Sequence, residues 1–111
     1  MVQPQVITDV REEPARHVEW TLSSASSTVI DTAATVYGWS ATETSGSATA
    51  AVDIYDEAGH AGVPVLPIRL ASGESAEAWY GPNGIRFRNA VHINVTSGAA
   101  RGSVFFHYHR A

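Results

Sequence analysis

The chain of 111 residues contains no cysteine and no lysine. Without cysteine it forms no disulfide, offers no thiolate nucleophile and cannot build a zinc ribbon or finger. Its seven basic residues are all arginine, and against eleven Asp and Glu they leave a formal net charge of −4. This balance argues against binding along a nucleic-acid backbone, which requires a basic stripe. We therefore expect no nucleic-acid partner.

Long apolar segments are also missing. No apolar run approaches the roughly 18 residues of a membrane span, and the first residues lack the basic and apolar regions of a secretion signal. We expect no membrane partner and an unexported product. At 11.8 kDa the chain has material for one hydrophobic core and none for a second domain.

Leucine and methionine are scarce, with three Leu and one Met against twelve Val, six Ile and nine Thr. Residues branched at the β-carbon favour pleated sheet over helix. The seventeen Ala favour helix by intrinsic propensity, but they are scattered among Ser, Thr and Gly and never form an amphipathic pattern of period 3.6. The composition predicts an all-β protein.

Apolar and polar residues alternate with period two in short segments that turn residues separate. Trp20 and Leu22, for example, share a face that Thr21 does not. We expect about eight short strands, roughly 8 to 12 residues apart, in an antiparallel β-sandwich of jelly-roll or immunoglobulin-like type. The alternating segments are 18–22, 28–31, 34–42, 49–55, 66–70, 75–80, 85–88, 91–95 and 104–108.

Proline and glycine refine this prediction. Pro67 lies within segment 66–70, and because proline cannot donate to a ladder, that strand should lie at a sheet edge or start late. The run Gly-Pro-Asn-Gly at 81–84 predicts a tight reversal. Trp79 and Tyr80 precede it, and since adjacent strand residues face opposite ways, one of the two should be exposed and bind a partner.

The first sixteen residues differ from the rest, because charged residues and prolines surround one short apolar piece, Val6-Ile7. We interpret residues 1–16 as an extended N-terminal arm and residues 17–111 as the β-sandwich domain. The arm is either a frayed terminus or a segment that orders against a neighbouring subunit through Val6 and Ile7.

Three histidines are the best metal candidates. If segments 91–95 and 104–108 pair as a hairpin with Val95 opposite Val104, His92 lies opposite His107 on the outer face, and His109 points the same way as His107. Imidazole binds zinc or iron, and a threefold oligomer would bring six such rings around its axis. No Asp, Glu or Cys lies at a matching spacing, however, so surface histidines, no metal and no cofactor are the expectation.

Catalytic constellations are not evident. Nothing in the sequence places two carboxylates across a cleft, and no serine lies in a Gly-x-Ser-x-Gly elbow. We expect no enzyme. The tryptophans and tyrosines fill the core or anchor an interface, or alternatively form a platform on which sugars stack.

Four stretches, at 34–40, 43–46, 70–75 and 79–86, resemble small virion proteins of tailed bacteriophages of actinobacteria, which occur as head-decoration or minor tail proteins. The similarity spans about residues 34 to 108. It implies a structural protein of the virion that binds the major capsid protein or a tail protein, and a homotrimer, since many such proteins sit at local threefold positions. Capsid decoration is the leading expectation. A minor tail or baseplate protein, and a carbohydrate-binding module that contacts host glycans through Trp79 and Tyr80, are the alternatives.

Overall fold

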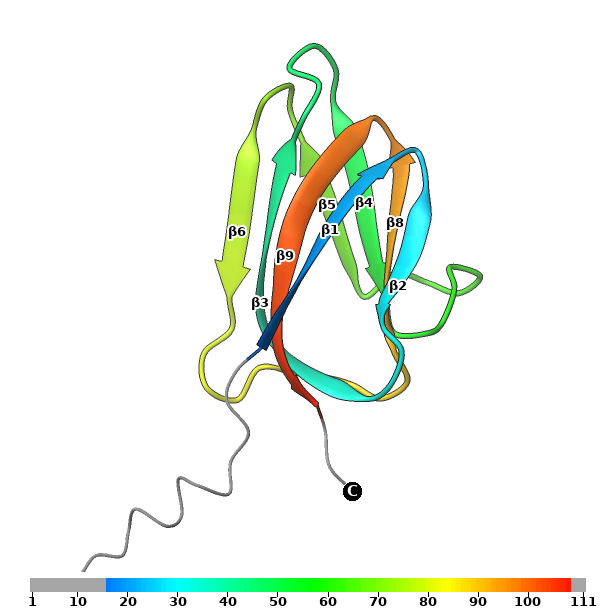
Figure 1. Ribbon diagram of the computed structural model, residues 1–111, viewed down its shortest axis with the longest axis vertical. Coiled ribbons are helices and arrows are strands. Elements are labelled where there is room, and N and C mark those ends of the chain that lie inside the picture. Colours follow the sequence, from blue (N-terminus) through cyan, green and yellow to red (C-terminus); the bar gives the residue numbers. More distant parts are fainter. Residues whose placement is uncertain (1–15, 109–111) are drawn as a thin grey trace, which may run out of the picture.

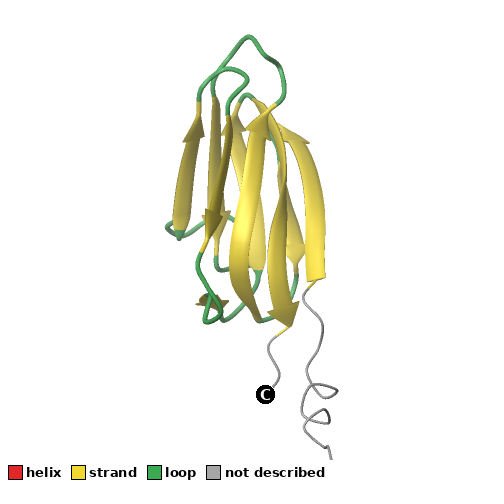
Figure 2. Ribbon diagram, turned by 90° about the vertical axis from the view of Figure 1, so that its left-hand side faces the viewer, coloured by secondary structure: helices red, strands yellow, loops and turns green. Residues whose placement is uncertain are grey.

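The computed structural model describes residues 16–108, and these form nine β-strands and no helix. Figure 2 shows that the strands form two layers and that loops join the strands at their ends. The predicted all-β class is confirmed, and among these residues no helix has the length and apolarity needed to cross a membrane. Val6, Ile7 and His109 lie outside the described residues, as does the predicted arm apart from Arg16.

The strands follow the predicted segments closely. The main difference is the last strand, which begins at Ala99 and not near Val104, because its first residues are small or polar and carry little alternation. The strands are β1 (Arg16–Ser23), β2 (Ser26–Ile30), β3 (Ala34–Glu43), β4 (Ala50–Tyr55), β5 (Leu66–Leu70), β6 (Ser75–Trp79), β7 (Ile85–Phe87), β8 (Val91–Ser97) and β9 (Ala99–Tyr108).

The strands form two antiparallel sheets (Figure 1). The five-stranded sheet has the order β1-β9-β3-β6 with β7 also paired to β3, and the four-stranded sheet has the order β2-β8-β4-β5. The pairs β1–β9, β2–β8, β3–β6 and β4–β5 are nested, so that the chain resembles one long hairpin wrapped around a core. This nesting is the strand order of a jelly roll. β5, which contains Pro67, is an edge strand, as predicted.

The hairpin predicted between segments 91–95 and 104–108 is not formed. β8 pairs with β2 and β4, whereas β9 pairs with β1 and β3. The chain crosses from one sheet to the other at Gly98, whose φ is 78° and whose carbonyl accepts a hydrogen bond from the backbone N–H of Ser24 at 3.0 Å. His92 and His107 therefore lie in different sheets and do not form a pair.

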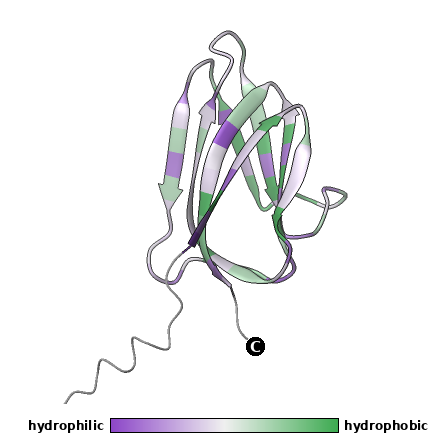
Figure 3. Cartoon of the chain, viewed as in Figure 1, coloured by the Kyte–Doolittle hydropathy of each residue, from purple (hydrophilic) through white to green (hydrophobic). Residues whose placement is uncertain are grey.

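The inner faces of both sheets supply the core, which includes Ala50, Val52 and Ile54, the alternate apolar residues of segment 49–55. Hydrophilic and hydrophobic residues alternate along several strands in Figure 3, as a sheet with one buried face requires. Trp20 is the largest side chain of the core and is 5% exposed.

In β3 the predicted alternation fails part-way along the strand. The sequence pattern puts Ala34, Val36 and Gly38 on one face, but a bulge between Val36 and Gly38 shifts the register against β9. A bulge inserts one extra residue, so every later side chain changes face. Trp39 and Ala41 consequently pack on the core, and Gly38 moves to the outer face.

Candidate interaction site on the outer face of the five-stranded sheet

The outer face of the five-stranded sheet carries three rows of side chains, each crossing β1, β9, β3 and β6 in register. We call them the aromatic row, the serine row and the threonine row. In that strand order, the aromatic row is His17, Phe105, Gly38 and Trp79; the serine row is Glu19, Ser103, Ser40 and Glu77; and the threonine row is Thr21, Arg101, Thr42 and Ser75.

Trp79 is the most exposed tryptophan, with 68% of its surface accessible. It stays over the sheet because its row neighbour is Gly38: a Cβ on Gly38 would lie 2.9 Å from the Trp79 ring. The Tyr37 ring supports it from the side, with centroids 6.3 Å apart. The indole is thus an exposed apolar surface in a defined place.

Phe105 stands on the other side of Gly38 and is also exposed. Two strand spacings separate Phe105 from Trp79, which is about 9.6 Å. A hollow of about 520 Å³ is lined by these two rings together with Trp39 and Ala78, and it extends to Ser40 and Glu77 of the next row. This hollow is apolar on its walls and polar at one end.

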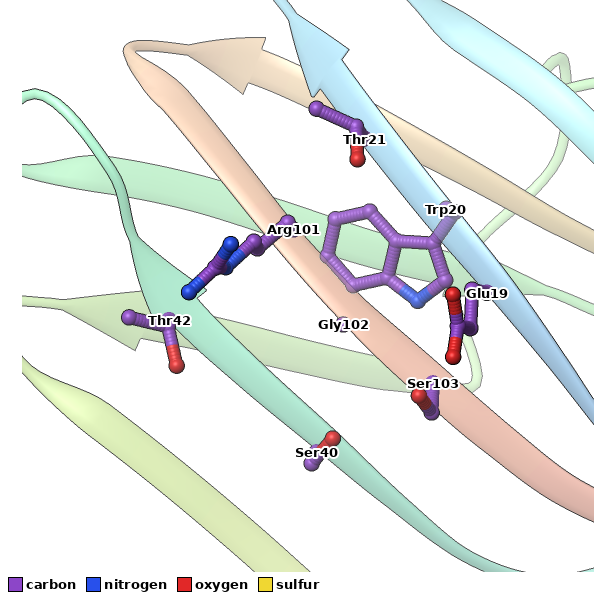
Figure 4. A pocket seen from close by; sticks show the side chains of 8 residues that line it. All are labelled: Glu19, Trp20, Thr21, Ser40, Thr42, Arg101, Gly102 and Ser103. Atoms are coloured by element: carbon purple, nitrogen blue, oxygen red, sulfur yellow. The ribbon is translucent and has the colours of Figure 1, made fainter.

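A second hollow, of about 310 Å³, lies over the serine and threonine rows (Figure 4). Figure 4 shows the Trp20 ring at Gly102, where β9 carries no side chain. Around it lie hydroxyl groups and two opposite charges. The lining residues other than Trp20 and Gly102 are Glu19, Thr21, Ser40, Thr42, Arg101 and Ser103. Ser40 lines both hollows, so they form one continuous surface.

The predicted contrast between Trp79 and Tyr80 is confirmed, because Trp79 is exposed and Tyr80 is half-buried. The Tyr80 hydroxyl accepts a hydrogen bond of 2.7 Å from Trp39 Nε1. Phe105 takes the place beside Trp79 that the sequence analysis gave to Tyr80. Phe105 lies there because β9 pairs with β3, and no local pattern in the sequence predicts this pairing.

Two of the three histidines proposed as metal candidates, His92 and His107, are not brought together, and His109 lies outside the described residues. His107 Nδ1 shares a hydrogen bond of 2.9 Å with the Tyr37 hydroxyl, and its Nε2 is buried without a partner among the described residues. His92 lies in the other sheet and is 6% exposed. Within residues 16–108 no group of three or more His, Cys, Asp and Glu side chains could hold a metal ion.

The carboxylates of the loops bind nearby backbone. Asp56 accepts hydrogen bonds from the backbone N–H groups of residues 88–90, and Glu57 accepts them from Ala61 and Gly62. Asp53 forms an ion pair with Arg69 at 2.9 Å. These groups hold turns and strands in place, and they lie outside the three rows.

Glu43 is the carboxylate that the sequence analysis missed. At the end of β3 it is 3% exposed and accepts hydrogen bonds of 2.8 Å from the backbone N–H groups of Ser45, Gly46 and Gly73, and one from the Ser45 hydroxyl. The Ser45 hydroxyl and these N–H groups lower the pKa of Glu43 from 4.5 to about 2. Glu43 thereby ties the β3–β4 turn to the β5–β6 turn.

No protein-family model and no curated protein matches the chain. Among solved structures, the chain is similar to one from the Bacillus endospore appendages, which form a novel family of disulfide-linked pili. The identity is 20%, the match covers 84% of this chain and 80% of that chain, and the TM-score is 0.48.

Proposed function

We propose that this protein is a non-enzymatic structural protein of a bacteriophage virion, and that it decorates the assembled capsid by docking through the outer face of its five-stranded sheet. The observation that carries the proposal is Trp79, an indole held in place over Gly38 with 68% of its surface exposed. Aromatic side chains with large exposed area are the commonest anchors of protein interfaces.

The energetics favour a repeated surface as the partner. Burying one large apolar side chain contributes about 1.5–3 kcal/mol, and docking must offset the lost freedom of the bound protein. Trp79 and Phe105 alone give a small interface. If the protein is an oligomer on a symmetric shell, each contact is multiplied, so that weak single interfaces produce firm attachment.

The resemblance of residues 34–108 to virion proteins of tailed actinobacteriophages supports the same function. The jelly roll is also frequent in viral capsid domains, although it occurs in lectins as well and does not decide function alone. We accordingly propose a homotrimer, located in the virion, whose partner is the major capsid protein. In a minor tail or baseplate protein the partner would be a tail protein, and the number of copies per particle would be far smaller.

Binding to assembled shells tests the proposal. Purified protein is mixed with shells of the parent phage that lack it, and the bound fraction is measured after sedimentation. We expect saturable binding that Trp79→Ala weakens at least tenfold, because the variant removes the most exposed aromatic side chain of this face. Val63→Ala is the matched control, since Val63 is also exposed but lies on the β4–β5 loop. Equal binding by Trp79→Ala and the parent protein would contradict docking through this face.

Glycan binding is the second candidate, and the hollow between Trp79 and Phe105 favours it. Aromatic faces stack on sugar rings, while Ser40 and Glu77 at one end of this hollow can bond to sugar hydroxyls. A soluble host glycan should then change tryptophan fluorescence, and Trp79→Ala should abolish the change. A glycan response together with no binding to shells would favour this candidate over capsid decoration.

A further inference from the structure

A pair of histidines lies on the outer side of the other, four-stranded sheet. His92 belongs to β8 and is 6% exposed, whereas His60 belongs to the β4–β5 loop and is exposed. Figure 1 shows this loop projecting beside β2. The loop brings His60 Nδ1 to within 3.2 Å of His92 Nε2, although the two residues are 32 positions apart in the chain.

Two ring nitrogens at this separation cannot both present bare lone pairs to one another. Either a proton or a cation must lie between them. In a tetrahedral zinc site with bonds of 2.0–2.1 Å, two nitrogen ligands are about 3.3 Å apart. The distance between His60 Nδ1 and His92 Nε2 therefore suits a bound metal ion as well as a shared proton.

The surroundings prepare His92 to act as a ligand. Its Nδ1 lies 2.8 Å from the Thr28 hydroxyl, which can accept a hydrogen bond from Nδ1–H, and the lone pair of the neutral ring is then on Nε2. A hydrogen bond of this kind, donated by the ring N–H that does not bind metal, is the usual support of a metal-ligating histidine. Tyr55 packs against both imidazoles, with centroids 6.2 and 6.3 Å away, and further restricts their orientation.

Access from solvent also favours a cation. Because His60 is exposed, an ion can enter from solvent without unfolding the sheet.

We propose that His60 and His92 form a binding site for a divalent transition-metal ion of the zinc type. The ion is held by His60 Nδ1 and His92 Nε2, and two of its four positions remain for water. On binding, the proton on His60 Nδ1 leaves and a proton is taken up at the exposed Nε2, so the ring stays neutral. This site is independent of the capsid-docking face, which belongs to the opposite sheet.

Calorimetric titration of the full chain with zinc chloride at pH 7.5 tests the site. We expect one saturable site per chain, with binding lost in His60→Ala and weakened 10–100-fold in Thr28→Val, which removes the support of His92. His17→Ala is the control and should bind as the parent protein does. Saturating zinc should also raise the unfolding temperature of the parent protein but not of His60→Ala.

Two results would overturn the proposal. One is the lack of saturable zinc binding by the parent protein, which would leave a shared proton between His60 and His92. The other is unchanged binding by His60→Ala, which would place the ion elsewhere. Circular dichroism of each variant verifies that the sandwich is intact, and His60 is suited to substitution because it lies on an exposed loop.

Discussion

Glu43 shows how a single side chain fixes one end of this sandwich. Its carboxylate accepts three hydrogen bonds from backbone N–H groups, two in its own turn and one from Gly73 of the β5–β6 turn. Removing the charge would weaken all three hydrogen bonds, because a carboxylate is a stronger acceptor than a neutral side-chain oxygen. The structure therefore assigns Glu43 a stabilising role, although it resembles an ordinary turn residue in the sequence.

The lowered pKa of Glu43 predicts a specific dependence of stability on pH. The folded-state pKa of about 2 lies below the ordinary value of 4.5. The stabilisation is complete above pH 4.5 and is lost as the pH falls towards 2, because the unfolded chain takes up the proton first. Urea unfolding midpoints measured from pH 7 to pH 2 should therefore fall over this window.

The variant Glu43→Gln isolates this contribution. It should be less stable than the parent protein at pH 7, and the difference between the two midpoints should shrink as the pH falls from about 5 to 2. Glu77→Gln is the matched control on the exposed end of the serine row, where we expect little change. A difference between Glu43→Gln and the parent that stays constant with pH would show that the carboxylate charge is not responsible.

At the scale of the elements, the sequence predicted where strands lie but not all of their partners. Alternation identifies a strand and its buried face locally, and Pro67 correctly marked β5 as an edge. The pairing of β8 and β9 was predicted wrongly, because a hairpin and a corner between sheets are both short and both contain glycine. The bulge in β3 was equally hidden, since nothing in residues 36–38 distinguishes it from regular strand.

The corner at Gly98 yields a prediction about this topology. Gly98 has a φ of 78°, and a Cβ would collide with the Thr49 carbonyl and lie 3.0 Å from Ala50 Cα. Gly46 has a similar φ of 73° but no neighbour within 4 Å. Chemical denaturation should show a loss of about 1–2 kcal/mol for Gly46→Ala from backbone strain alone. Gly98→Ala should lose about 1–3 kcal/mol more from overpacking.

The comparison between these two glycines separates backbone strain from contact. If Gly98→Ala were no less stable than Gly46→Ala, the corner would not be packed against the start of β4. The two variants share the same substitution and nearly the same φ. The difference between their free energies of unfolding therefore measures how closely the chain packs where it crosses between the sheets.

The candidate site depends on the same long-range pairing. Trp79 could be selected from the sequence, because it precedes the turn at 81–84 and one of two adjacent aromatic residues had to be exposed. Phe105 and Gly38 could not, since they meet Trp79 only through the registers of β3 with β6 and β9. His60 was missed for a similar reason, because its distance from His92 depends on how the β4–β5 loop folds back.

At the scale of the whole molecule, our proposal places the binding of a repeated partner on one sheet face, the outer face of the five-stranded sheet. The three rows place an aromatic anchor beside hydroxyl groups and a few charges, and protein interfaces combine apolar and polar groups in this way. The rows cross four of the five strands of this sheet, β1, β9, β3 and β6, so the fold fixes the outline of this surface. Because the strands hold these side chains in fixed positions, every copy of the protein presents the same outer sheet face to a partner.

Electron cryo-microscopy of the parent virion tests this claim most directly. We expect density for the sandwich at the local threefold positions of the capsid, in numbers that match the lattice, with Trp79 and Phe105 turned towards the major capsid protein. Density confined to the tail, or copies on the capsid whose outer sheet face points into solvent, would contradict the account.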